Sequence, residues 1–175
     1  SVKPNWHDAT DITGFRSSVN RNYYVTDFMR FLVKAKLHPE VPFFVCLDEM
    51  NLAPVEEYFA DFLSVIESRK RKKNGAIVTD ALVPASVFND KDYDPGFDIF
   101  EKLGLMVSES PTEVKEGEMK EIPYSTDKHK KVDKPYVRQD IVDDLKLEGL
   151  TIPQNVIIIG TVNMDDTTNS FSRKV

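Results

Sequence analysis

The chain has 175 residues, of which 41% are hydrophobic and 30% charged, enough to build one domain with its own core. Its net charge of −6 argues against a general nucleic-acid surface, so any contact with DNA must be local or come from another part of a longer protein. No apolar run approaches the ~20 residues of a membrane span, and the N-terminal stretch lacks the apolar segment of a signal peptide. We therefore expect no membrane association. The single cysteine cannot form a disulfide within the chain, so we expect a reducing, cytoplasmic location.

The first part of the chain predicts a loop or hairpin over residues 16–22, followed by a helix. Thr26 is the expected N-cap, with Asp27 in the first turn. Apolar residues then recur at helical spacing, namely Phe28, Phe31, Leu32 and Ala35. The pair His38-Pro39 should end this helix.

Aromatic and basic residues flank the same loop: Phe15, Tyr23 and Tyr24 lie close to Arg16 and Arg21. Such a loop could grip a strand or a polypeptide in a central pore. Packing of the aromatic residues against the core is the favoured interpretation.

Residues 43–47 form a continuous apolar run opened by Pro42, which predicts a strand buried on both faces, as in a parallel sheet. The single cysteine, Cys46, would then be a small core residue. The run leads directly into Asp48 and Glu49. Open α/β sheets bind ligands at the carboxyl ends of their strands, so this acid pair is a candidate for holding a metal ion and polarising water. The alternative is a strand that ends in a solvated acidic turn.

The clearest helical pattern follows, with Pro54 expected as the first helical residue. Its apolar stripe consists of Val55, Tyr58, Phe59, Phe62, Leu63 and Ile66. The basic run over residues 69–73 should form its cationic end, and a contact with phosphate is the less favoured interpretation of that run.

The region from 74 to 150 is less regular. We expect a strand over 76–84, loops, short hairpins or partial disorder over 87–131, an amphipathic helix within 135–149 and a turn at 150–153. A second buried strand is expected over residues 156–162, and Asn163 follows it.

An acidic stretch in this region matches the ligand spacing of an EF-hand loop, through Asp90, Asp92, Asp94, Asp98 and Glu101. The sixth position is Pro95, however, and a glycine comes one residue late, at Gly96. Because proline cannot adopt the glycine turn that the calcium loop needs, a solvated acidic loop is the better interpretation. A two-metal nuclease site built from both acidic pairs, 48–49 and 165–166, would gain support from a nearby lysine, and none is evident.

Polar side chains thus follow two predicted strands where each strand ends. Asp48 and Glu49 follow the first, and Asn163 follows the second. Because the carboxyl ends of parallel strands lie side by side, the three groups are expected to converge on one site. The amide of Asn163 can both donate and accept, so it could align a water molecule between a phosphate and Glu49.

The segments FFVCLDEMN, PVEEYFADFLSVIES and VIIIGTVNMDDTTNSFSRKV, together with the opening VKPNWHDATDITGF, resemble the core of AAA+ NTPases, and most of all the McrB-like branch. The resemblance covers roughly residues 1–69 and 152–175 and implies an α/β fold with the parallel sheet of the P-loop NTPases. It implies that Asp48 and Glu49 are the Walker B pair, with Asp48 holding Mg²⁺, and that Asn163 is the sensor-1 residue. Asp166 matches the acidic position downstream of the sensor. Arg173 lies close to the position at which the family carries the arginines of its subunit interface.

Two features depart from the family pattern. No G-x-x-x-x-G-K-[ST] phosphate loop occurs, so we expect this chain to be an incomplete core that lacks Walker A and is inactive by itself. The sensor strand also lies more than 100 residues after the acid pair, which predicts an irregular insertion over about 74–150.

For the whole protein, the resemblance implies an Mg²⁺-dependent GTPase, or an ATPase, that works at the subunit interfaces of a ring, expected to be a hexamer. It further implies movement along DNA, contacted through other parts of the protein, and a nuclease partner. The alternatives are a MoxR-like remodelling ATPase and a binding or assembly module of the same fold without activity.

Overall fold

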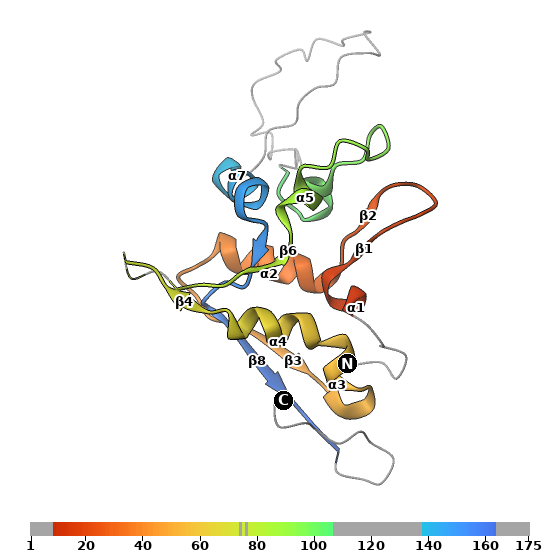
Figure 1. Ribbon diagram of the computed structural model, residues 1–175. Helices are drawn as coiled ribbons and strands as arrows, with labels where there is room; N and C mark the ends of the chain where they lie inside the picture. The colour runs from red at the N-terminus through yellow and green to blue at the C-terminus, as the bar shows by residue number, and fades with distance from the viewer. Residues whose placement is uncertain (1–8, 74, 76, 107–137, 164–175) are drawn as a thin grey trace, which may run out of the picture.

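The structure is a computed structural model that describes residues 9–73, 75, 77–106 and 138–163, and its fold is mixed α/β (Figure 1). Its helices are α1 (Thr10–Thr13), α2 (Asp27–Leu37), the 3-10 helix η1 (Met50–Leu52), α3 (Val55–Tyr58), α4 (Ala60–Glu67), α5 (Ala85–Phe88), α6 (Ile99–Lys102) and α7 (Gln139–Glu148). Its strands are β1 (Phe15–Arg16), β2 (Tyr23–Tyr24), β3 (Phe43–Leu47), β4 (Lys70–Arg71), β5 (Ile77–Val78), β6 (Ala81–Val83), β7 (Leu150–Thr151) and β8 (Val156–Gly160).

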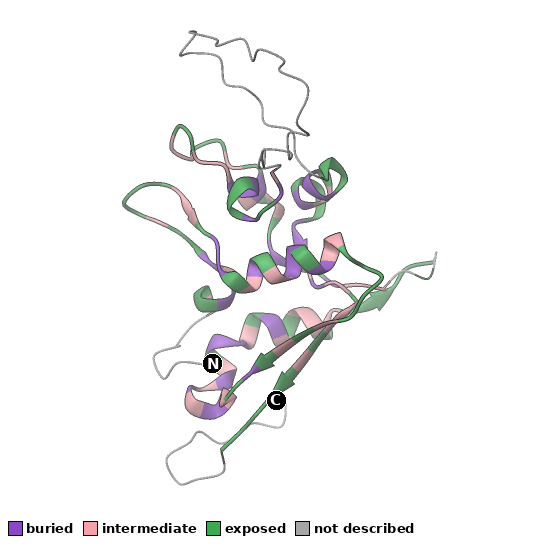
Figure 2. Cartoon of the chain, turned by 180° about the vertical axis from the view of Figure 1, so that it is seen from behind, coloured by how far each residue is buried: buried purple, intermediate pink, exposed green. Residues whose placement is uncertain are grey.

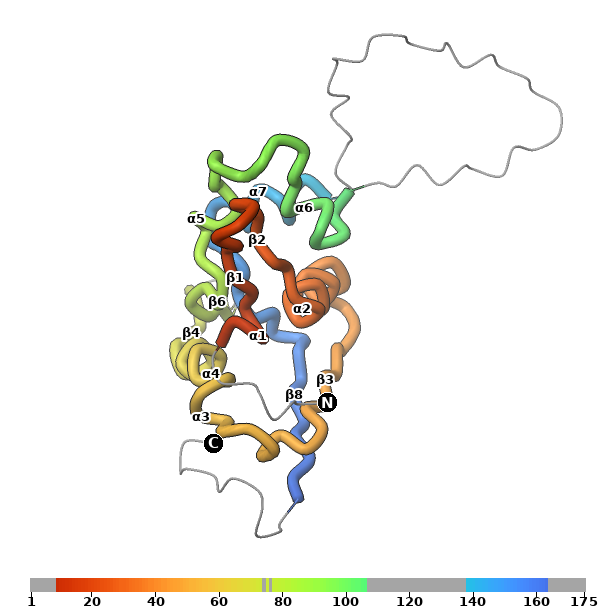
Figure 3. The backbone as a smooth tube through the Cα atoms, turned by 90° about the vertical axis from the view of Figure 1, so that its right-hand side faces the viewer, coloured from red at the N-terminus to blue at the C-terminus, as the bar shows by residue number. Residues whose placement is uncertain are grey.

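The strands β3 and β8 form a parallel pair, as the sequence predicts. Their register joins five residue pairs, from Phe43 opposite Val156 to Leu47 opposite Gly160. The carboxyl end of β8 lies with α3 at one end of the molecule, whereas α5, α6 and α7 lie at the other (Figure 1, Figure 3). The parallel pair therefore carries its two following segments to the same end.

The expectation that both strands are buried on both faces is wrong for the described part of the chain. Side chains alternate between the faces of a sheet, and only one face packs against the helices. The opposite face leaves Phe44 59% exposed and Ile159 49% exposed, and Cys46 is exposed rather than a core residue (Figure 2). The sequence pattern reports that side chains are apolar, but it does not report which face a neighbouring element covers.

Helix α2 is built as predicted. The hydroxyl of Thr26 accepts a hydrogen bond from the Met29 amide at 3.1 Å and so caps the helix. The same hydroxyl donates to the Ile12 carbonyl at 2.7 Å, which ties the cap to α1. The helix ends at Leu37, with His38 as its C-cap.

The single helix predicted after the acid pair is instead two helices, α3 and α4, which are separated at Phe59 (φ −112°, ψ 4°). Pro54 is the N-cap rather than the first helical residue. Tyr58 and Phe59 are both buried at the break, and the Tyr58 hydroxyl donates to the Met50 carbonyl at 2.9 Å. These tertiary contacts override the local helical pattern.

The basic run does not form a helix end. Lys70 and Arg71 make up β4, which pairs antiparallel with β5, and Lys70 forms an ion pair with Asp80. The basic residues are therefore displayed on a hairpin.

The region expected to be irregular contains regular structure where it is described. Strand β7 pairs antiparallel with β6, so residues 150 and 151 form a strand and not the predicted turn. The predicted helix is present as α7, which ends at Gly149 with φ 81°. A Cβ at Gly149 would lie 2.5 Å from the Val83 carbonyl, so only glycine allows α7 to end against β6.

A short helix, α6, lies within the stretch predicted as loops or short hairpins, and another, α5, overlaps the start of that stretch. Asp98, a member of the EF-hand-like set, caps α6 by accepting from the Phe100 amide at 2.8 Å. Asp90, another member, forms an ion pair with Arg16 on β1. Within the described ranges, no helix has both the length and the apolar character needed to cross a membrane.

Candidate functional site

The acid pair and the candidate sensor residue come together at the carboxyl ends of β3 and β8. Asp48 and Glu49 follow β3 directly, and Asn163 lies just beyond β8. The Asn163 amide Nδ2 donates to Glu49 Oε1 at 2.9 Å. Asp48 is exposed and Glu49 is half-buried, so both carboxylates can be reached from solvent. The expected convergence of these three side chains is thus present in the structure.

Thr161 is a member of this cluster that the sequence analysis missed. Its hydroxyl donates to Asp48 Oδ1 at 2.7 Å and accepts from the Glu49 amide at 2.8 Å. Its backbone also bonds the chain on both sides of the acids, at the Leu47 carbonyl and the Met50 amide. The in-register pairing of Leu47 with Gly160 places Thr161 opposite Asp48, so a correct strand register would have identified it.

The backbone at Glu49 adopts a left-handed conformation with φ 53°. This conformation costs a non-glycine residue roughly 1–2 kcal/mol. Adjacent side chains on a straight strand point to opposite faces. The turn at Glu49 instead allows Asp48 to bond Thr161 while Glu49 bonds Asn163. Strain held in place by hydrogen bonds at a cluster of polar groups is typical of functional sites.

A second residue that the sequence analysis missed lies beneath the acid turn. Asn51 is only 2% exposed. Its side-chain amide donates to the backbone carbonyl of Asn163 at 2.6 Å and accepts from the backbone amide of Asn163 at 3.2 Å. Nearby, burial raises the pKa of the Tyr58 hydroxyl to about 12, with a smaller contribution from the negative charge of Glu56. Tyr58 therefore stays protonated well above neutral pH, and its hydroxyl donates to the Met50 carbonyl.

The donor set suits a weakly held magnesium ion. Mg²⁺ is commonly bound by one or two carboxylates, with water and substrate phosphate completing its octahedron. Exposed Asp48 fits that role. No group of three or more His, Cys, Asp or Glu side chains capable of holding a metal occurs among the described residues.

Two residues assigned through the resemblance, Asp166 and Arg173, lie outside the described residues. Their roles stay predictions.

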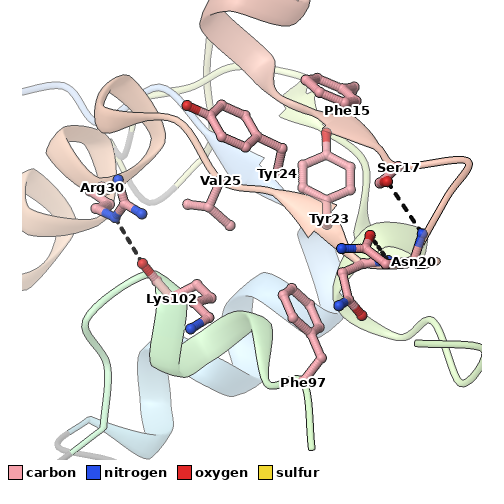
Figure 4. Close-up of a pocket in the computed structure, with 10 residues that line it drawn as sticks. Phe15, Ser17, Asn20, Tyr23, Tyr24, Val25, Arg30, Phe97 and Lys102 are labelled. Carbon is pink, nitrogen blue, oxygen red and sulfur yellow. Dashed lines mark hydrogen bonds between the residues drawn. The ribbon is translucent and has the colours of Figure 1, made fainter. Parts of the chain in front are cut away.

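A cavity of about 410 Å³ lies away from this cluster, beside the β1–β2 hairpin (Figure 4). Phe15 and Tyr24 on the hairpin stack with their ring centroids 5.3 Å apart and are 46% and 60% exposed, so the expectation that they pack in the core is wrong. Tyr23 does pack against the core, and its hydroxyl donates to the Thr13 carbonyl. None of the residues of the acid cluster lines this cavity.

Comparisons of the chain with models of protein families, with curated proteins and with solved structures found no match.

Proposed function

We propose that this chain carries the metal- and water-handling half of a nucleotide-hydrolysis site in a McrB-like AAA+ NTPase with the P-loop α/β fold. The observation that carries the proposal is the hydrogen-bonded set of Asp48, Glu49, Thr161 and Asn163 at the carboxyl ends of two parallel strands. Adjacent carboxylates next to an amide donor at this edge suit phosphoryl transfer to water.

Each side chain has a role that follows from its chemistry. When bound, Mg²⁺ neutralises the charge of the phosphate oxygens, and Asp48 is the residue that would hold it. Glu49 accepts the proton of the attacking water, and the Asn163 amide keeps Glu49 oriented through its bond to Oε1. Thr161 fixes Asp48 and the backbone of Glu49 relative to β8.

The resemblance extends the proposal to the whole protein. It favours GTP over ATP, a homo-oligomeric ring, movement along DNA, a nuclease partner and action in the cytoplasm. A MoxR-like remodelling ATPase would use the same residues, and a side-by-side measurement of GTP and ATP turnover separates the two branches.

The test is the substitution Glu49→Gln in the full-length protein, because this chain contains no phosphate loop. Loss of a general base should lower kcat by about 10²–10⁴-fold while nucleotide binding persists. Hydrolysis is followed by phosphate release, and binding by a fluorescent nucleotide. Glu101→Gln on α6 makes the same change of charge at the other end of the molecule (Figure 3) and should leave kcat unchanged.

Unchanged hydrolysis in Glu49→Gln would overturn the assignment of Glu49. A wild-type protein that neither binds nor hydrolyses nucleotide would point instead to a binding or assembly module.

A further inference from the structure

Asn51 is an unusual residue to bury at the end of a strand pair. Asparagine side chains are mostly exposed, because burying an amide is costly unless its donor and acceptor are both used. Asn51 is 2% exposed, and in the described part of the chain only Thr26 and Thr79 are other buried polar residues. The Thr26 hydroxyl caps a helix, and the Thr79 hydroxyl accepts from the Ile152 amide. Asn51 has a different kind of partner.

Both polar ends of the Asn51 amide bond the backbone of one residue. Its Nδ2 donates to the Asn163 carbonyl at 2.6 Å, and its Oδ1 accepts from the Asn163 amide at 3.2 Å. This two-point contact resembles the exchange between paired strand residues. It occurs beyond Gly160, where the backbone register between β3 and β8 ends. Asn51 thus continues the pairing of the sheet with a side chain.

The residue held in this way is the one that contacts the acid. The Asn163 side chain donates to Glu49 Oε1. The Asn163 backbone is bonded by Asn51, which lies only two positions after Glu49 in the chain. The segment that carries Asn51 is supported in turn by the Tyr58 hydroxyl at the Met50 carbonyl. A displacement of the Asn163 backbone would therefore move the side-chain amide of Asn163 away from Glu49.

We propose that Asn51 is a positioning residue, which acts on the reaction only through Asn163 by clamping its backbone so that its side chain orients Glu49. The effect on turnover rests on the proposed function, whereas the clamp itself does not. Asparagine suits the position because a donor and an acceptor are both required there. Asn51→Leu removes both groups at similar size, and Asn51→Asp keeps the acceptor alone.

The first experiment is a double-mutant cycle on hydrolysis by the full-length protein. Asn51→Leu should lower kcat about 10–100-fold with little change in KM, as expected for a residue that orients a catalytic group. In an Asn163→Ala background, the same substitution should change kcat by less than about twofold, because the group that it positions is gone. An equal fall of kcat in both backgrounds would overturn the proposal and leave Asn51 a structural residue.

The second experiment measures the clamp without hydrolysis, by amide hydrogen exchange at Asn163. Asn51→Leu should speed this exchange about tenfold or more, since the amide loses its acceptor. Asn51→Asp should keep most of the protection of the Asn163 backbone amide, and it provides the test if the leucine variant does not fold. Thr79→Val, a matched loss of a buried polar group away from the site, should leave the Asn163 amide unaffected.

The two experiments separate the two ideas. A wild-type protein without hydrolysis but with exchange at Asn163 controlled by Asn51 would refute the proposed function and retain the clamp. Exchange at Asn163 that does not respond to Asn51→Leu would refute the clamp, whatever the activity.

Discussion

The two faces of the β3–β8 pair have the same apolar chemistry and different surroundings. On one face, Leu47 is buried, and the ring of Phe43 meets Phe31 of α2 edge to face with 5.7 Å between centroids. We call this face the packed side. On the other, the bare face, Phe44 and Ile159 are about half exposed (Figure 2). Parallel strands normally carry apolar side chains on both sides, because other elements cover both faces of the sheet. Composition alone does not distinguish these faces.

The acid cluster is held by hydrogen bonds from both sides of the strand pair. Buried Tyr58 donates to the Met50 carbonyl in the segment after β3, and buried Asn51 bonds the backbone of the segment after β8. By the alternation of side chains along the strands, Asp48 and Thr161 lie on the bare face, where the Thr161 hydroxyl donates to Asp48. Stability is therefore expected to depend on the packed side, whereas the geometry of the site depends on both.

The largest expected effect comes from opening a hole on the packed side. Phe62 of α4 is 1% exposed and stacks on Phe59 with 4.4 Å between ring centroids, and it meets Phe28 edge to face. Phe62→Ala should lower the free energy of unfolding by about 3–5 kcal/mol, because both burial and packing are lost. Urea denaturation followed by circular dichroism measures the change. A loss below about 1 kcal/mol would mean that this layer is not the main core.

An intermediate effect is expected at alkaline pH. Burial raises the pKa of Tyr23, Tyr58 and Tyr93 to about 12, above the ordinary value of 10 that the unfolded chain should show. Between pH 10 and 12 the unfolded chain releases protons that the folded chain retains, so stability should be unaffected below pH 10 and fall as pH rises through this window.

The urea midpoint, measured from pH 8 to 12, checks this expectation. Tyr58→Phe should reduce the slope above pH 10, and it should also cost about 1 kcal/mol at neutral pH through the lost bond to the Met50 carbonyl. A slope that is identical in the wild type and in Tyr58→Phe would contradict the burial of this hydroxyl.

Local patterns predicted the elements whose cause is local. The Thr26 cap, the helix now seen as α7, the strand β3 and the strand expected over 156–162, observed as the shorter β8, all follow from spacing and capping within the segment itself. The parallel pairing and the meeting of Asp48, Glu49 and Asn163 followed from the shared polarity of the strand ends. These were inferences from one general rule of sheets.

The remaining features depend on contacts between distant segments. Thr161 and Asn51 join residues more than 100 positions apart, and each requires the strand register to be known to one residue. The β6–β7 pair consists of very short strands that have no periodicity of their own. The bare face of β3 depends on what lies next to the strand, which the strand's own residues do not encode.

The smallest expected effect comes from the bare face, and it makes the sharpest contrast with Phe62. Phe44 is 59% exposed, so Phe44→Thr removes an aromatic ring that is largely in contact with water and keeps a side chain suited to a strand. The free energy of unfolding should change by no more than about 0.5 kcal/mol. The same urea titration measures it, with Leu47→Ala as the matched substitution on the packed face of the same strand, where about 2–5 kcal/mol should be lost. If Phe44→Thr and Leu47→Ala proved equally destabilising, this face would be covered in the folded protein, and the two sides of the sheet would be alike.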